Sequence, residues 1–151
     1  MFKKKRFLVG LVAGLLAVVM FPATASATSD TDTESFDNGN TITANAWIQS
    51  FTWTGCGDFS SSAVMNTPNT SSITNATSFY DIGLGSVSIK AVSIESSRES
   101  ASSLRWTNSA GVTGSYLSGS VCGGWGSVYV GMDVAASSLH YGNYRVASAH
   151  I

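Results

Sequence analysis

Short segments in which apolar and polar residues alternate recur along this chain, and they constrain its fold more than any other feature. Every second residue from Val128 to Val134 is apolar, and the residues between them are mostly small or polar. A period of two is typical of a strand with one buried face. Such segments begin near Thr41 and recur about every 8–12 residues, with turn signals between them. We therefore predict an all-β fold, a single antiparallel β-sandwich or small barrel of about seven to eight strands.

Several segments interrupt this pattern. A shift of the apolar positions near Val92 predicts a β-bulge. Residues 108–111, Asn-Ser-Ala-Gly, predict a hairpin turn into the next strand. Residues 95–103 are the best place for a short helix, because two glutamates stand four positions apart there. For residues 135–139 we predict a loop or a single helical turn.

Residues 1–27 have the three parts of a secretory signal peptide. Four basic residues precede an apolar run from Phe7 to Phe21, and residues 25–27 read Ala-Ser-Ala, an Ala-x-Ala cleavage signature. The run is shorter than the roughly 20 residues that span a bilayer. We expect cleavage after Ala27, no transmembrane segment in the mature chain, and release of a bacterial protein into the extracellular medium.

The chain after the leader divides into two parts. Residues 28–40 are polar and acidic, which predicts a flexible lead-in, and residues 41–151 form the β-sandwich domain. The acidic residues of the lead-in resemble the start of a calcium-binding loop, but Ser35 and Thr41 stand where such a loop needs Gly and Glu. We therefore predict no metal site.

The charge of the mature part excludes one class of partner. Four basic residues stand against nine acidic ones after residue 27, a formal charge of −5. A phosphate backbone is repelled by that balance, so nucleic acid is not an expected partner. Attraction to an anionic membrane surface lacks support for the same reason.

The two cysteines, Cys56 and Cys122, predict a structural disulfide in an oxidising compartment. Their spacing does not match a Cys-x-x-Cys redox motif. A zinc site needs two further ligands, for which His140 and His150 are the only histidines. Two free thiols are the remaining alternative.

Three aromatic residues in loop-like segments are candidates for ligand binding. Trp125 is flanked by two glycines, and Tyr141 and Tyr144 bracket a Gly-Asn pair. Exposed aromatic rings beside amides and hydroxyls suit a sugar or peptide ligand. The alternative for Trp125 is packing against the disulfide, as in immunoglobulin-type sandwiches. Three other tryptophans, at strand positions, are expected to fill the core: Trp47, Trp53 and Trp106.

No constellation of residues predicts catalysis. The chain has no Gly-x-Ser-x-Gly motif. Its two histidines are expected at the surface or at a strand edge. Acidic residues that could supply a glycosidase pair are more simply explained as solvated charges or turn residues. We assign no catalytic residue and no cofactor.

Three functions are weighed on these grounds. The first is a secreted, non-enzymatic binding domain that recognises a carbohydrate or a protein surface. The second is a secreted antagonist, such as a bacteriocin, a toxin or an enzyme inhibitor, because a small exported domain with one disulfide also fits that class. The third, a small hydrolase, requires a cleft for which the sequence provides no signal.

Overall fold

The structure, a computed structural model, describes residues 26–50 and 55–151. These residues form nine strands and one short 3₁₀ helix. The strands are β1 Ala27–Ser35, β2 Thr41–Gln49, β3 Cys56–Met65, β4 Ile73–Gly83, β5 Val87–Val92, β6 Ser103–Asn108, β7 Gly114–Gly123, β8 Ser127–His140 and β9 Asn143–His150. Residues 1–25 of the predicted leader lie outside the described residues, and so does Trp53.

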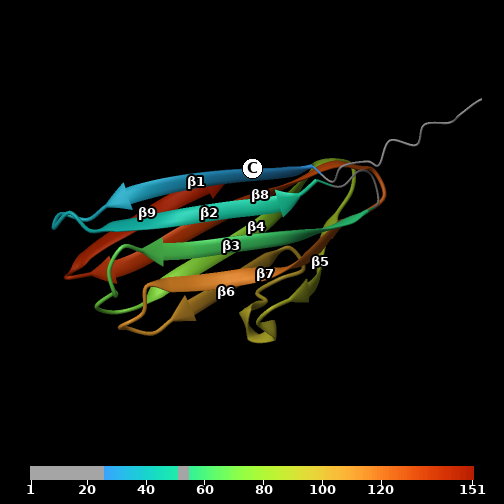
Figure 1. Cartoon of the computed structure of the whole chain (residues 1–151). Helices are drawn as coiled ribbons and strands as arrows, with labels where there is room; N and C mark the ends of the chain where they lie inside the picture. Colours follow the sequence, from blue (N-terminus) through green and yellow to red (C-terminus); the bar gives the residue numbers. More distant parts are fainter. Residues whose placement is uncertain (1–25, 51–54) are drawn as a thin grey trace, which may run out of the picture.

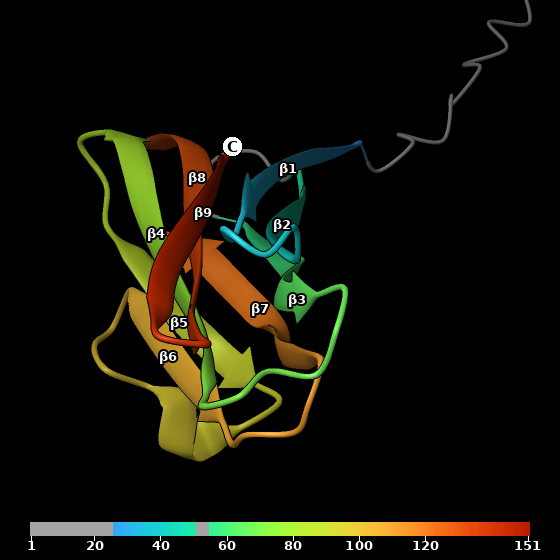
Figure 2. The same cartoon turned by 90° about the vertical axis from the view of Figure 1, so that its left-hand side faces the viewer.

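The nine strands form two packed antiparallel sheets (Figures 1 and 2). One sheet has the order β1-β2-β3-β7-β5 and the other the order β6-β4-β8-β9. The predicted all-β sandwich is confirmed. Among the described residues no helix is long and apolar enough to cross a membrane.

The core lies between the sheets and follows the alternation of the sequence. In β2 the buried residues are Ile42, Ala44, Ala46 and Ile48, and Trp47 between them is 38 % exposed. This strand pairs with both neighbours without a register shift. Trp47 therefore lies on the outer face and not in the core, whereas Trp106 is partly buried against the core.

A buried polar cluster links the two sheets within this core. The hydroxyl groups of Ser61 on β3 and Thr77 on β4 are 2.6 Å apart. The amide of Asn75 on β4 donates to Ser61 Oγ at 3.1 Å and to the carbonyl oxygen of Ser115 on β7 at 3.4 Å. Such bonds are directional, unlike apolar contacts, so the cluster favours one alignment of the sheets.

The disulfide between Cys56 and Cys122 is confirmed. The two residues are direct cross-strand partners on β3 and β7, at the start of one strand and near the end of the other. The bridge therefore staples adjacent strands at one end of the sandwich.

The predicted flexible lead-in is wrong for most of its length, since residues 27–35 form β1. All but one of the residues of β1 are exposed, so no apolar alternation marked it as a strand. It pairs along its whole length with β2. The additional strand also raises the number of strands above the predicted seven to eight.

Two local predictions are wrong and two are confirmed. Residues 135–139 are no loop but the second half of β8, where small alternating residues keep the strand pattern. Residues 108–111 turn the chain but form no hairpin, because β6 and β7 belong to different sheets. The helix in 95–103 is one 3₁₀ turn, Glu95–Ser97. The bulge is confirmed by a register shift between Ile89 and Ala91.

Removing the disulfide tests its contribution to stability. The Cys56→Ala/Cys122→Ala variant releases a chain segment of 66 positions, and the chain-entropy model predicts a loss of about 4 kcal/mol in the free energy of unfolding. Urea denaturation measures this loss, with the reduced wild-type protein as the control. A loss below about 1 kcal/mol would contradict the prediction.

Candidate functional site

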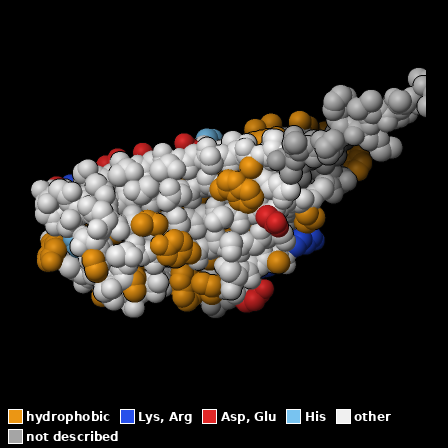
Figure 3. Space-filling view, in the orientation of Figure 1, with side chains coloured by type: hydrophobic (Ala, Val, Ile, Leu, Met, Phe, Trp, Pro, Cys, Tyr) orange, Lys and Arg blue, Asp and Glu red, His pale blue; other side chains and the backbone are white. Residues whose placement is uncertain are grey.

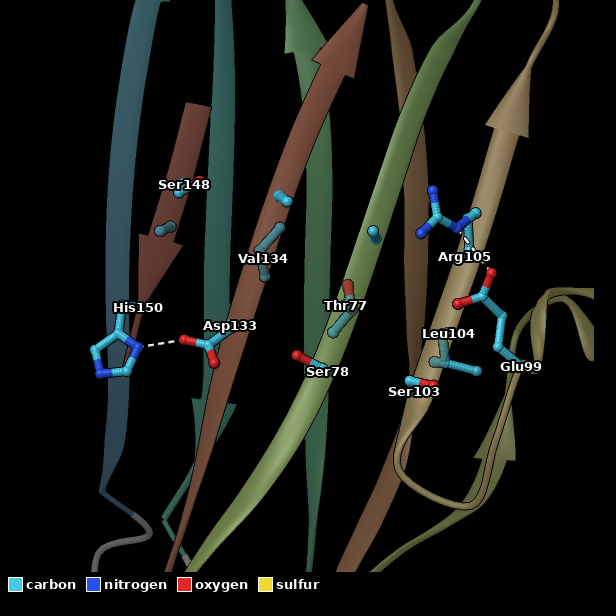
Figure 4. Close-up of a pocket in the computed structure, with 13 residues that line it drawn as sticks. Thr77, Ser78, Glu99, Ser103, Leu104, Arg105, Asp133, Val134, Ser148 and His150 are labelled. Carbon is cyan, nitrogen blue, oxygen red and sulfur yellow. Dashed lines mark hydrogen bonds and ion pairs between the residues drawn. The ribbon is translucent and has the colours of Figure 1, made fainter. Parts of the chain in front are cut away.

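A groove on the outer face of the β6-β4-β8-β9 sheet is the candidate site (Figure 4). Its volume is about 490 Å³. Two rows of cross-strand neighbours form it. One row contains Arg105, Ala76, Ala135 and Ser148, and the other Ser103, Ser78, Asp133 and His150. The central strands β4 and β8 contribute mostly small side chains, so the floor is low between the larger side chains of the edge strands.

One side of the groove carries a chain of polar contacts through His150. Its Nδ1 bonds to Oδ1 of Asp133, the residue directly opposite on β8. Its Nε2 lies 3.2 Å from the hydroxyl of Tyr80, which donates to the carbonyl oxygen of Ile151 at 2.5 Å. The rings of Tyr80 and His150 are stacked, with centroids 5.5 Å apart. Both nitrogens of the imidazole are therefore engaged.

The position of Tyr80 also affects its acidity. Partial burial raises the pKa of Tyr80 above its ordinary value of 10.0, and the nearby negative charge of Asp133 raises it further. Both effects favour the protonated phenol, which acts as a hydrogen-bond donor and not as a nucleophilic phenolate.

The opposite side of the groove carries an ion pair. Arg105 on β6 donates through Nε to Oε1 of Glu99 at 2.7 Å. Figure 4 shows this pair facing the Asp133–His150 pair, with Ser78 between them. Both side chains of the Arg105–Glu99 pair are about half exposed, so the pair adds little to stability. Each carboxylate in the groove thus has a basic partner.

Carboxylates from β1 hold the β9 side of the groove in place. Asp32 accepts a hydrogen bond from the backbone N–H of Ser148 at 2.8 Å. Asp30 accepts one from the backbone N–H of His150 at 2.9 Å. The pKa of Asp30 lies below its ordinary value of 3.8. The hydrogen bond from the backbone N–H of His150 is the main cause, and the one from the backbone N–H of Thr31 is the next. The acidic segment therefore positions two residues of the groove.

The three aromatic residues predicted for ligand binding do not form one site. Trp125 precedes β8 and Tyr141 follows it, and a strand of 14 residues is about 45 Å long. Trp125 is 85 % exposed, so it does not pack on the disulfide. Of the three, Tyr144 alone lies on the face that carries the groove, since every second residue of β9 from Tyr144 to His150 is exposed.

The two histidines occupy different environments. His140 is 1 % exposed and lies beside Phe36 and Tyr141, and its Nε2 is 2.9 Å from the amide nitrogen of Asn40. It is a core residue, which contradicts the predicted surface position. His150, in contrast, is at the surface as predicted.

Two arrangements that carry chemistry in other proteins, a serine–histidine contact and a cluster of metal ligands, are not found among the described residues of the groove. Within the described residues no serine hydroxyl bonds to His150, although a catalytic triad needs that contact. In the same part of the chain no three His, Cys, Asp or Glu side chains are close enough to hold a metal ion. What the groove offers is a set of hydroxyl, carboxylate, guanidinium and imidazole groups around a floor of small residues.

Neither Asp133 nor His150 was predicted from the sequence as a partner of the other. The signal that could have paired them is the two-residue turn Tyr141–Gly142, in which both residues have positive φ, +47° and +80°. A two-residue hairpin turn sets the register of the strands that follow. Counting outward from this turn places Asp133 opposite His150.

Comparison of the chain with protein-family models, with curated proteins and with solved structures found no match.

Acid titration tests the role of Asp30. Because its folded-state pKa lies below 3.8, this carboxylate stabilises the fold above that pH, and the contribution is lost as the pH falls through the folded-state value. Asp30→Asn keeps an acceptor oxygen but removes the titration. Urea unfolding between about pH 5 and pH 2 should therefore show a shallower loss of stability for the variant than for the wild type.

The matched control is Asp58→Asn, which changes an exposed aspartate on β3. We expect this variant to follow the pH dependence of the wild type more closely than Asp30→Asn does. Identical acid profiles for Asp30→Asn and the wild type would contradict the assigned role.

Proposed function

We propose that this protein is a secreted bacterial binding domain, not an enzyme, and that it binds an uncharged carbohydrate in the groove between Arg105 and His150. The observation that carries the proposal is the pair of cross-strand rows, with small residues on the central strands and polar groups at the sides. The groove volume of about 490 Å³ lies within the range of roughly 300–1,000 Å³ that is usual for ligand sites.

The balance of charges in the groove favours an uncharged ligand. Glu99 is paired with Arg105, and Asp133 with His150. At the Arg105–Glu99 pair a charged polymer would meet a like charge beside the opposite one, and the Asp133 carboxylate would repel an anionic polymer. Sugar hydroxyl groups both donate and accept hydrogen bonds, so they can use carboxylate, guanidinium and serine groups together.

The form of the site supports an extended ligand. The floor follows β4 and β8, and the Arg105–Glu99 and His150–Asp133 pairs stand on either side of it (Figure 4). Tyr80 lies two positions from Ser78 on β4, outside the groove lining, and its ring stacked on His150 supports that side of the groove.

Filling the floor of the groove tests the proposal. Ala135 lies between Ala76 and Ser148 in one of the rows, so Ala135→Leu places a branched side chain where the ligand is expected. Isothermal titration with soluble oligosaccharides of glucose, xylose and N-acetylglucosamine measures the affinity. We expect at least one class to bind, and the variant to lose about tenfold or more in affinity, roughly 1.4 kcal/mol.

Ser60→Leu is the matched control, because Ser60 is exposed on β3, on the outer face of the other sheet. It should retain the affinity of the wild type, and both variants should unfold within about 0.5 kcal/mol of it. Equal affinity of Ala135→Leu and wild type, or no binding of any oligosaccharide, would reject the proposal.

A further inference from the structure

Two loops at one end of the sandwich carry the most exposed large apolar side chains of the described residues. Leu84, between β4 and β5, is 92 % exposed, and Trp125, between β7 and β8, is 85 % exposed. Ile82 and Val128 beside them are 56 % and 74 % exposed. We call these four residues the apolar tip. Figure 3 shows hydrophobic side chains at this end of the molecule, on the right of the view.

Contacts between the two loops hold the apolar tip in place. The backbone N–H of Leu84 donates to the carbonyl oxygen of Gly126 at 3.1 Å, and that of Gly124 donates to Ser86 at 2.6 Å. A Cβ atom at Gly83 would clash with the carbonyl oxygen of Gly126, so the two backbones approach more closely than a side chain permits. The two loops that expose these side chains are therefore held together by their backbone contacts.

The apolar tip contains no charge of its own. Residues 82–86 and 123–128 include no Lys, Arg, Asp or Glu. The nearest acid in the sequence, Asp81, accepts a hydrogen bond from the backbone N–H of Gly85 at 3.0 Å. The domain behind the tip is acidic, with a formal charge of −5 after residue 27. An uncharged surface suits the tip, whereas an anionic surface would repel the domain.

The N-terminal segment joins the sandwich at the same end. The backbone N–H of Ser50 donates to Ser26 at 2.7 Å, and β1 begins at the end where the β7–β8 loop lies (Figure 1). Four residues separate Ser26 from the apolar run Phe7–Phe21, and four extended residues span at most about 14 Å. In the precursor, before the predicted cleavage after Ala27, a bilayer that holds this run is therefore tethered close to the end that carries the apolar tip.

The geometry points to an uncharged lipid bilayer as the partner of the apolar tip, with Leu84 and Trp125 inserted into its interfacial region. Tryptophan is favoured at that depth, and an aliphatic neighbour adds buried apolar area. A second copy of the chain is a poorer partner, because four side chains fall short of the roughly 800 Å² per partner of a stable interface. This inference does not rest on the proposed carbohydrate site.

Binding to lipid vesicles tests the inference. The protein is used in the form that the cell releases after any cleavage of the leader. We expect the wild type to sediment with phosphatidylcholine vesicles, and phosphatidylglycerol in the vesicles to weaken the binding. Leu84→Ser/Trp125→Ser should lower the partition coefficient about tenfold or more. Brominated phosphatidylcholine should quench the wild type more than Trp125→Ser, whether or not the N-terminal segment is retained.

Tyr141→Ser/Tyr144→Ser is the matched control, since it removes two exposed aromatic residues at the other end of β8. It should bind vesicles as the wild type does. An equal loss in both double variants, or equal quenching of wild type and Trp125→Ser, would overturn the inference. Self-association that disappears in Leu84→Ser/Trp125→Ser would overturn it too, because the tip would then be a contact between copies.

Discussion

The contact between two carboxylates of β1 and the outer edge of β9 joins the two sheets along one side of the sandwich. β9 is the last strand of its sheet, so its N–H groups on that side have no strand to pair with. The carboxylates of Asp30 and Asp32 accept hydrogen bonds from the backbone N–H groups of His150 and Ser148. They thereby join the edge of one sheet to the edge of the other. Open sheet edges can pair with foreign strands, and these carboxylates occupy two of the groups that such pairing needs.

The alternation of buried and exposed residues predicts the strands that contain apolar residues and misses those that lack them. The first half of β8 could be predicted from Val128 to Val134, but its second half consists of Ala, Ser, Leu and His. β1 has an entirely polar composition after Ala27. Its strand conformation depends on pairing with β2 and on its contacts with β9, which are non-local and leave no periodic pattern.

The disulfide could be predicted from two cysteines and an export signal, whereas the groove could not. The groove depends on the order of four strands, and neighbours such as Ala76 and Arg105 come from strands that are not consecutive. The pairing of Asp133 with His150 was hidden in a Tyr-Gly turn, which differs from the usual Asn-Gly signal. The exposed aromatic residues were found, but their separation follows from the length of β8.

β8 contributes both to the apolar tip and to the groove, and this fixes the distance between the two. Val128 and Asp133 are five positions apart on the same strand, which corresponds to about 17 Å along its axis. A ligand beside Asp133 therefore lies about 17 Å from the apolar tip, measured along β8. The extended strand sets this distance, and its pairing with β4 and β9 keeps the distance from changing. The domain would therefore hold a ligand in the groove at one fixed distance, along β8, from whatever the apolar tip contacts.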